Sequence, residues 1–518
     1  MRTGAEYRES LRDGRRVWVL GEGRVDDVTT HPVTAGMVDE YVAWYDRHFD
    51  PAWEDTLFTP PDAAGRRTPL AYLLPRCAED LRQMGKSYAA TLFHSAGNIT
   101  HDAAYGNLIA LGILHRTQRM NVSEAQIANA TAYRELIARS GRFLTFCAGG
   151  ATIGYRFRTD PSERVALRIV KETDAGLVIR GKIGMHTSPP FAEDIYIGSF
   201  SGVKYADCLA SFVVPVNDPG VTVICRKIAA RHQSRFVAPL SHRFDELDGQ
   251  LWLDDVLVPW ERLFLTDPAP EPGQTLRFDP RNTIAEWLFW HQLYCWYAKA
   301  EFALGLALAC IDVMGLREDQ QTLEYLTDML VDVQTVRSCL TAAELEPELS
   351  AAGYALPNNL HIASGSIAMQ KARQRLTETL RIMPGSSLVM APSDTDLADP
   401  ALTAGLEESF GGGKYTALQR AALLQLTWDH ISSGLDARES AFELHANGGI
   451  PAWRVQTRAR FARYNELANG VLQRLNVEIP PIDLESLRLV SRAQRRQVTP
   501  EAPPASAGKG AAPVDGGA

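Results

Sequence analysis

The sequence predicts an α+β fold in which helices and strands occupy separate parts of the chain. Apolar residues recur at helical spacing in the first and last parts, whereas the middle part holds short β-rich runs separated by Gly, Asp and Pro. This order differs from the strand–helix alternation that builds a parallel α/β sheet. No Gly-x-Gly-x-x-Gly motif follows a predicted strand, so a Rossmann dinucleotide site is not expected.

The length of the chain and these changes along it predict three domains and a tail. A chain of 518 residues exceeds the usual size of a single hydrophobic core. We expect a mostly helical domain at 1–145, a β-domain at 146–275, a helical bundle at 276–498 and a disordered tail at 499–518. The tail is rich in Pro, Ala and Gly and has little apolar surface to bury.

Helices are predicted wherever the apolar spacing follows the helical period. In the first domain such patterns cover 33–50 and 66–92, with prolines at 32, 51, 60 and 61 between them. In the last domain longer patterns predict four helices, at 287–313, 323–345, 363–382 and 417–433.

Strands are predicted in the middle of the chain. Five β-rich runs precede residue 230: VALRIV (165–170), GLVIRG (176–181), DIYIGSF (194–200), ASFVVPV (210–216) and GVTVICR (220–226). In the following segment, Leu251 and Leu253 indicate a buried strand, and the acid pair Asp254–Asp255 indicates a turn into a second apolar strand. Pro259 should end strand pairing, because proline cannot donate to a ladder.

Composition and charge indicate a cytoplasmic protein without a nucleic-acid or membrane partner. The net charge is −9 and the pI is near 5.8, which disfavours binding to polyanions. No run of eighteen apolar residues exists, and the basic N-terminus lacks the apolar segment of a signal peptide. Seven scattered cysteines without CxxC spacing argue against a disulfide framework and against a metal site.

Several long segments give the chain a resemblance to a known family. They are RTGAEYRESLRDGRRVWVLGEGRVDDVTTHP (2–32), KETDAGLVIRGKIGMHTSPPFAEDIYIGSF (171–200), APLSHRFDELDGQLWLDDVLVPWERLFL (238–265), HQLYCWYAKAEFALGLA (291–307) and LTWDHISSGLDARESAFELHANGGIPAWR (426–454). In order and register they resemble the 4-hydroxyphenylacetate 3-monooxygenase oxygenase-component family. The resemblance implies an acyl-CoA dehydrogenase-like fold, with an N-terminal helical domain, a middle β-barrel domain and a C-terminal helical bundle.

The resemblance also implies a chemistry and its partners. Members are two-component monooxygenases that react reduced flavin with O2 to form a C4a-hydroperoxide. We therefore expect FAD, used as FADH2 and with FMNH2 as the other possible flavin, and a separate NAD(P)H:flavin reductase that supplies it. A homotetramer is expected for the same reason, and because the helices at 287–313 and 417–433 are more apolar than one bundle requires.

Flavin contacts are expected at two places. Thr187, followed by Ser188, matches the family Thr whose hydroxyl faces the flavin ring, although a Ser/Thr turn before proline explains the same residues. Gly448 and Gly449, with Ile450 and Pro451 after them, match the segment that cradles the flavin diphosphate. Paired glycines admit an anion close to the backbone, but they are equally typical of a helix C-cap.

The substrate positions depart from the family pattern. Family members present Gly-Arg-x-Pro-Asp-Tyr to a phenol, and the matching stretch here places Asn98 at the Arg and Asp102 near the Tyr, with Tyr105 one turn on. Phe146 stands where the family has a phenol-binding His. His101 is a candidate general base and Asp102 a candidate partner, although adjacent helical residues do not face each other. The other reading is a solvated helix start with Thr100 as its N-cap.

Two further groups complete the candidate site. Ser199, Phe200 and Ser201 match a loop that borders flavin and substrate in the family, and an ordinary β-turn is the alternative. His291 and Cys295 could suggest the [4Fe–4S] cluster of the related 4-hydroxybutyryl-CoA dehydratase. Since no cysteine occurs at 98–102, where that relative has two, we expect no metal and assign both residues to the core or the flavin pocket.

The sequence thus predicts a reduced-flavin-dependent monooxygenase with catalytic residues His101, Asp102 and Thr187. The changed phenol positions predict an aromatic, heteroaromatic or amine substrate other than 4-hydroxyphenylacetate. The alternative is a non-oxygenating flavin lyase or dehydrogenase acting on an acyl thioester. A protein that keeps the fold without flavin chemistry is the third possibility.

Overall fold

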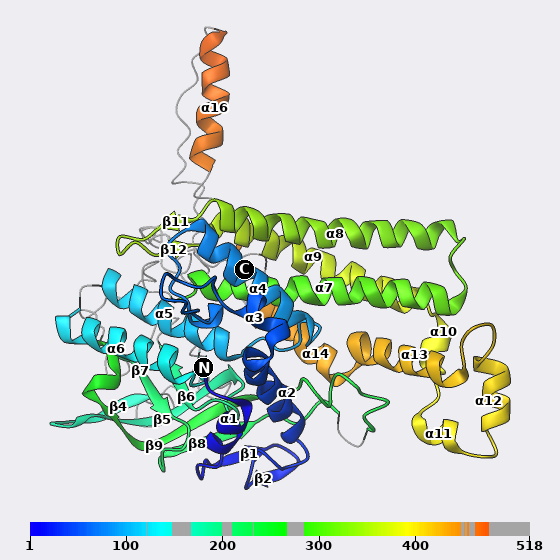
Figure 1. The fold of residues 1–518 in the computed structure, drawn as a ribbon, viewed down its shortest axis with the longest axis horizontal. Helices are drawn as coiled ribbons and strands as arrows, with labels where there is room; N and C mark the ends of the chain where they lie inside the picture. The colour runs from blue at the N-terminus through cyan, green and yellow to red at the C-terminus, as the bar shows by residue number, and fades with distance from the viewer. Residues whose placement is uncertain are drawn as a thin grey trace, which may run out of the picture. The chain divides into compact units, whose positions relative to one another are not determined.

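Helices, strands and helices follow one another along the chain in the predicted order (Figure 1). The computed structural model describes residues 1–120, 122–147, 167–198, 210–230, 233–266, 284–446, 450, 453–454 and 461–475. Residues 1–453 form one compact unit, and 454–518 form a second whose described element is helix α16 (Phe461–Arg474). The predicted tail at 499–518 lies outside the described residues.

The first part of the chain is mainly helical. Its helices are α1 (Gly4–Ser10), α2 (Ala35–Asp46), α3 (Glu54–Leu57), α4 (Ala78–Phe93), α5 (Ala103–Arg119) and α6 (Glu124–Ser140), with 3-10 turns η1 (Arg47–Phe49), η2 (Pro51–Trp53) and η3 (Leu70–Tyr72). Local signals set their ends. Ser123 and Gln126 form a capping box at the start of α6, and Gly141 ends it in the left-handed conformation (φ 63°).

The first part also contributes a hairpin that the sequence analysis did not separate from the helices. Strands β1 (Val17–Val19) and β2 (Gly23–Val25) pair with each other, and β1 runs parallel to β8 with Val17 opposite Val223. The prediction of a helical N-terminal region is therefore incomplete. The three-residue strands are too short for their alternation to be distinguished from a loop.

The middle strands form two sheets. A six-stranded sheet has the order β2-β1-β8-β9-β5-β4, and a four-stranded sheet has the order β10-β7-β6-β3. The strands are β3 (Leu144–Cys147), β4 (Arg168–Thr173), β5 (Gly176–Thr187), β6 (Asp194–Ile197), β7 (Ala210–Pro215), β8 (Val221–Cys225), β9 (Asp248–Pro259) and β10 (Leu263–Thr266). The sheets contact each other through β3 with β5 and through β7 with β9. Closure into the expected barrel is not seen among the strands described.

Strand β9 corrects the expected turn at Asp254–Asp255. The chain does not reverse there, because β9 pairs with β5 on both sides of the acid pair. Ile179 lies opposite Val256 and Gly181 opposite Leu253, so two residues of β9 face one of β5 in a β-bulge. Asp255 adopts a positive φ of 53°. Pro259 does end the ladder, as predicted, and the 3-10 turn η7 (Trp260–Arg262) leads to β10.

The C-terminal helices confirm the predicted patterns closely. They are α7 (Glu286–Met314), α8 (Gln320–Leu345), α9 (Asn359–Ile382), α10 (Ser386–Val389), α11 (Asp394–Ala398), α12 (Thr403–Phe410), α13 (Ala417–Ser432) and α14 (Gly434–Ala441), followed by the π-helical turn η8 (Phe442–Ala446). A two-stranded hairpin, β11 (Glu348–Leu349) with β12 (Ala355–Leu356), lies between α8 and α9.

Helix α7 is buried on almost all sides because α4, α5, α8, α9 and α13 pack around it. Within the described residues, no helix is both long and apolar enough to cross a membrane. The fold is thus α+β, as predicted. The domain boundaries at 145 and 275 stay predictions: the change from helix to strand after α6 lies near the first, and the second falls outside the described residues.

Candidate active site

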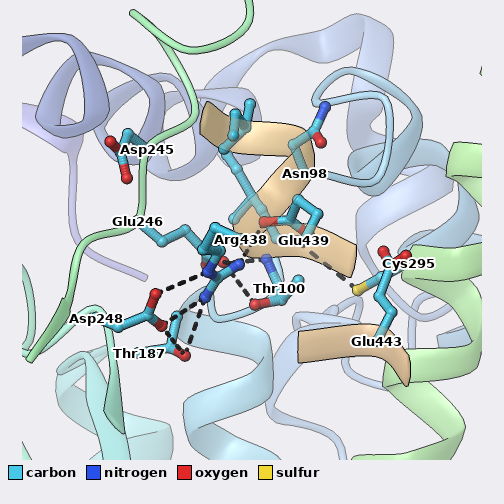
Figure 2. A network of polar contacts seen from close by, with 12 residues as sticks. Asn98, Thr100, Thr187, Asp245, Glu246, Asp248, Cys295, Arg438, Glu439 and Glu443 are labelled. Atoms are coloured by element: carbon cyan, nitrogen blue, oxygen red, sulfur yellow. Dashed lines mark hydrogen bonds and ion pairs between the residues drawn. The ribbon is translucent and has the colours of Figure 1, made fainter. Parts of the chain in front are cut away.

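Four segments that are distant in sequence converge on the side chain of Arg438 (Figure 2). They are the loop at 94–102 before α5, the end of β5, the loop at 238–248 before β9, and helix α14. The Arg438 guanidinium donates to both carboxylate oxygens of Asp248, with Nε–Oδ2 and Nη2–Oδ1 distances of 2.8 and 2.7 Å. It also pairs with Glu439, and with Glu246 at 3.6 Å. A buried guanidinium with this many partners is a fixed positive centre.

Thr187 lies at the edge of this centre, at the end of β5. Its hydroxyl donates to Asp248 Oδ1 at 2.9 Å and accepts from Nη2 of Arg438 at 3.2 Å. Burial alone would raise the pKa of Asp248, but the charges and hydrogen bonds of Arg438 and Arg226 hold this pKa well below its usual range. Asp248 is therefore a carboxylate, and the hydroxyl hydrogen of Thr187 is committed to it. The Thr187 oxygen remains as a hydrogen-bond acceptor.

Glu246 fastens the loop before α5 to the rest of the site. Its Oε1 accepts from the backbone N–H groups of Thr100 (2.9 Å) and His101 (2.7 Å), and its Oε2 lies 2.5 Å from the Thr100 hydroxyl. Burial, opposed by Arg438 and assisted by Glu439, raises the pKa of Glu246 to about 8. The carboxyl group therefore exchanges a proton in the neutral to alkaline range.

His101 lies in an aromatic cluster. Its ring is 4.4 Å from the Tyr105 ring and stacks on Phe146 at 5.9 Å with an interplanar angle of 24°. Phe442 of η8 lies 6.4 Å away. Nδ1 is 2.8 Å from the Thr100 hydroxyl. Burial and the charge of Arg438 lower the pKa of His101 to about 3, so the ring is neutral.

The Asp102 carboxylate caps helix α5 and does not make the contact with His101 that the sequence left open. It is the N-cap of α5 and accepts from the backbone N–H of Tyr105 at 2.8 Å. The alternative of a solvated helix start capped by Thr100 is wrong, since Thr100, His101 and Asp102 are all buried. Burial raises the pKa of Asp102 to about 6. The histidine closest to its carboxylate is His291 of α7, with an Oδ1–Nε2 distance of 3.7 Å.

The structure brings some of the predicted substrate residues together and separates others. His101, Tyr105 and Phe146 share the aromatic cluster. Asn98 instead donates to the Ser95 carbonyl at 3.0 Å and lines a small cavity with Lys299 and other charged groups. Cys295 is fully buried in α7, as the assignment of this residue to the core predicts.

The predicted flavin residues are described only in part. Ser188 has a positive φ of 62°, and its hydroxyl lies 2.8 Å from that of Tyr41, which donates to the His101 carbonyl at 2.8 Å. Residues 199–201, 448, 449 and 451 lie outside the described residues, and Ile450 is helical and half-buried. His186, the residue before Thr187, is 4% exposed. Neither of its ring nitrogens has a hydrogen-bond partner in the described part of the chain.

A second layer of buried charges lies behind Arg438. Lys299 of α7 donates to Glu439 at 2.7 Å and to Glu443 at 2.5 Å. Arg373 of α9 pairs with Glu443 at 2.7 Å and with Asp436 at 2.8 Å. This layer joins α7, α9 and α14 by ion pairs between groups whose side chains are 2–12% exposed.

Sequence reasoning missed Arg438, Glu246 and Asp248, which organise the site. Signals for them exist in the sequence. Glu246 and Asp248 lie immediately before the apolar alternation of β9. Arg438 lies three or four residues from Leu435, Ala441 and Phe442, which places it on an apolar helical face. Charged residues at such positions need partners, but a single sequence does not say which segments supply them.

Two family models match almost the whole chain. The model described as 4-hydroxyphenylacetate 3-hydroxylase N terminal matches residues 3–265, and the corresponding C-terminal model matches residues 278–473. Together they include every segment that builds the site.

Individual proteins show the same similarity. The oxygenase component of 4-nitrophenol 4-monooxygenase/4-nitrocatechol 2-monooxygenase from Rhodococcus opacus is 28% identical over 466 residues, which cover 86% of this chain and 85% of that protein. The 4-hydroxyphenylacetate 3-monooxygenase oxygenase component of Thermus thermophilus is 29% identical over 451 residues, covering 85% and 91%. A crystal structure of such an oxygenase component complexed with FAD superposes with a TM-score of 0.82 at 26% identity, covering 92% of this chain and 99% of the other.

Proposed function

The chain belongs to the 4-hydroxyphenylacetate 3-hydroxylase family, and from this membership we propose how its site carries out flavin-dependent oxygenation. The protein is a monooxygenase that uses FAD and acts on an aromatic substrate. The observation that carries this assignment is the similarity, along nearly the full chain, to an oxygenase component whose structure contains FAD. When bound, reduced flavin supplies the activation of O2.

The buried polar groups around β5 fit a flavin ring. Thr187 presents an oxygen whose hydrogen is held by Asp248, so it would accept a hydrogen bond from a donor such as the N5–H of reduced flavin. His186, buried and without a partner among the described residues, would supply a further ring nitrogen to a bound group. Arg438 would keep Asp248 ionised and hold the Thr187 hydroxyl in place beside the flavin, because it donates to both residues.

The aromatic cluster would bind the substrate. His101 stacks on Phe146, the position at which related phenol hydroxylases have a histidine, so an imidazole is present in the same region but comes from the loop before α5. Nε2 of His101 would contact a polar hydrogen or acceptor of the substrate, since Nδ1 of the same ring faces the Thr100 hydroxyl. Because Asn98 and Asp102 are engaged elsewhere, the proposed substrate is an aromatic compound other than 4-hydroxyphenylacetate.

A separate reductase supplies the reduced flavin, as the description of the relatives as oxygenase components implies. Beyond this, we propose a homotetramer and a cytoplasmic location. The second is supported by free thiols at all six cysteines that the structure describes.

The alternative of a non-oxygenating lyase or dehydrogenase is not favoured. The relatives described above are monooxygenases. The sequence also has no cysteine at 98–102, where the related dehydratase has two ligands of its [4Fe–4S] cluster.

The test uses the whole chain with photoreduced FAD and a panel of phenols, N-heteroaromatic compounds and aromatic amines under ¹⁸O2. We expect one class to acquire a single ¹⁸O atom, detected by mass spectrometry, without any reductase present. NADH with oxidised FAD but no reductase is the control and should give no product. Turnover of an acyl-CoA panel with no ¹⁸O uptake from any aromatic compound would overturn the proposal.

A further inference from the structure

We propose that Glu246, Thr100 and His101 form a proton relay that sets which ring nitrogen of His101 carries hydrogen and takes up the proton released by the substrate. The relay gives Glu246 and Thr100 the role of positioning residues for His101. It rests on the proposed function only in assigning the outer nitrogen of His101 to the substrate. The relay itself rests on contacts within the chain.

The three groups form one continuous line of hydrogen bonds. The hydroxyl oxygen of Thr100 lies between the other two groups. It is 2.5 Å from Oε2 of Glu246 and 2.8 Å from Nδ1 of His101. All three residues are at most 3% exposed, so water does not compete for these bonds. The single hydroxyl hydrogen of Thr100 can point to only one of its two neighbours at a time.

Two arrangements of hydrogens satisfy this line. When Glu246 is a carboxylate, Thr100 donates to Oε2 and accepts from the Nδ1–H of His101, which leaves a lone pair on Nε2. When Glu246 is protonated on Oε2, it donates to Thr100, Thr100 donates to Nδ1, and Nε2 carries the hydrogen. The state of Glu246 therefore determines whether His101 presents an acceptor or a donor.

Proton transfer interconverts these two arrangements, and each proton that one group releases is taken up by the next. A proton from a substrate O–H or N–H binds to the Nε2 lone pair, the hydrogen on Nδ1 passes to Thr100, and the Thr100 hydrogen passes to Oε2 of Glu246. The substrate is left as an anion, His101 ends neutral, and Glu246 ends protonated. The reverse sequence returns a proton to the product.

The surroundings explain why the proton would rest on Glu246. An imidazolium at His101 is disfavoured by burial and by Arg438, which together lower the pKa of His101 to about 3. Burial raises the pKa of Glu246 to about 8. The titratable or charged groups facing Glu246 are Arg438 and Glu439 of α14, Tyr41 of α2, Tyr105 of α5, Cys295 of α7, and His101 beside it.

The backbone contacts of Glu246 make the relay rigid. Oε1 accepts from two backbone N–H groups, at Thr100 and His101, so the carboxyl group cannot rotate away without leaving both unpaired. Oε2 is thereby held toward the Thr100 hydroxyl.

The proposed relay fits a substrate that must lose a proton before oxygenation, which means a ring-bound O–H or N–H.

The test compares the wild type with Thr100→Val, which removes the hydroxyl at nearly constant volume, and with Thr100→Ser, which retains it. Proteins labelled with [¹⁵N]histidine are examined without flavin by solid-state NMR, and the His101 signals are assigned by their loss in His101→Gln. In the wild type and Thr100→Ser, the hydrogen should move from Nε2 to Nδ1 as the pH rises from about 6 to about 10. In Thr100→Val this movement should be absent.

Glu246→Gln provides a second variant in case Thr100→Val does not fold. Its amide oxygen keeps both backbone contacts, and its amide hydrogen donates to Thr100, so Nε2 of His101 should carry hydrogen at every pH. With the substrate found for the proposed function, kcat should fall by at least about tenfold in Thr100→Val, with KM little changed and the alkaline rise of the rate lost. A pH-dependent tautomer in Glu246→Gln or Thr100→Val would overturn the relay. If no aromatic compound is oxygenated by any form, the proposed function fails while the NMR result still decides the relay.

Discussion

At the scale of single residues, the site depends on how buried charges direct neutral hydroxyl groups. Asp248 and Arg438 together determine that Thr187 presents an oxygen rather than a hydrogen. Glu246 determines in the same way where the hydroxyl hydrogen of Thr100 points. Through Thr100 it determines which ring nitrogen of His101 carries hydrogen. In both cases a carboxyl group with little exposure acts on a neutral side chain that we propose lies closer to the flavin or the substrate.

Thr187→Ala should impair oxygen chemistry more than flavin binding. Loss of one hydrogen bond to the cofactor costs about 0.5–1.5 kcal/mol of binding, while the loss of the fixed oxygen should divert O2 to hydrogen peroxide. The measurements are the dissociation constant of reduced FAD and the ratio of product to NADH consumed in a coupled assay. Thr187→Ser is the matched control and should keep most of the coupling. Unchanged coupling in the alanine variant would exclude the role.

Turnover of 4-hydroxyphenylacetate should be negligible. Asn98, Asp102 and Phe146 replace the groups with which a phenol-hydroxylating relative would bind this substrate, and a pocket built around hydrogen bonds discriminates strongly when they are absent. Asp102 is engaged as the cap of α5, and the Asn98 amide turns toward Ser95. The check is a substrate panel assayed with reductase and FAD. Efficient formation of the corresponding catechol would contradict this expectation.

The sequence indicated candidate residues with recognisable chemistry, whose roles stay predictions, and missed the charged residues that surround them. His101, Tyr105 and Phe146 were selected as substrate residues, and the structure places their rings together. Glu246 and Arg438 were not selected, because their importance comes from contacts between positions 192 residues apart. Nothing in the local pattern specifies that pairing.

At the scale of elements, a buried carboxyl group links three helices. Glu344 of α8 accepts from Nε1 of Trp290 at 3.0 Å and from the hydroxyl of Tyr294, both on α7, and Gly85 of α4 leaves room for it. Burial raises the pKa of Glu344 from 4.5 to about 7. The protonated form is therefore the one that the folded chain favours.

Glu344 should consequently contribute a decrease in stability between about pH 5 and about pH 7. Glu344→Gln should remove this contribution, while those of Glu246 and Asp102, whose pKa values burial also raises, remain. An unfolded glutamic acid titrates near 4.5, so above that pH the unfolded chain releases a proton that the folded chain still holds. The difference amounts to about 3 kcal/mol once the pH exceeds the folded pKa. Thermal unfolding at about pH 5 and about pH 8 measures it, with the exposed Glu324→Gln as control. If Tm falls equally between about pH 5 and about pH 8 in Glu344→Gln and Glu324→Gln, Glu344 is not a source of this pH dependence.

Which elements could be predicted depends on the length of their pattern. Helices α7, α8, α9 and α13 were found because each repeats the helical period over several turns. The acid pair in β9 was misread as a turn, because Asp favours turns and only pairing with β5 shows that the chain continues. Strands β1 and β2 escaped notice because they are three residues each.

At the scale of the whole molecule, the predicted order of helices and strands is also what assembles the site. The compact unit at 1–453 brings the loop before α5, the end of β5, the loop before β9 and helix α14 together. No one of these segments contains a complete site. We therefore expect flavin-dependent oxygenation to be lost with any change that separates the strands of the middle region from α14.

The surface of α8 supports the expectation that the chain forms a homotetramer. Leu323, Leu330 and Val331 are 41%, 47% and 57% exposed, and their spacing of seven and eight residues places them on one face of the helix. Figure 1 shows α8 beside α7 and α9, and the buried side chains of α8 include Met329, Val333 and Val336. Large apolar side chains aligned in this way are typical of a surface covered by another subunit.

Light scattering at micromolar concentration should therefore give about four times the chain mass of 57.1 kDa. The double variant Leu330→Glu/Val331→Glu should reduce the measured mass, because two carboxylates would be desolvated in the contact between copies. Leu20→Glu changes a side chain that is equally exposed but lies outside α8, and should leave the mass unchanged. A wild-type protein that is monomeric at this concentration would refute the tetramer. A tetramer that tolerates both charges would show that α8 is not the contact, since an apolar helix face cannot bury two unpaired carboxylates without weakening the assembly.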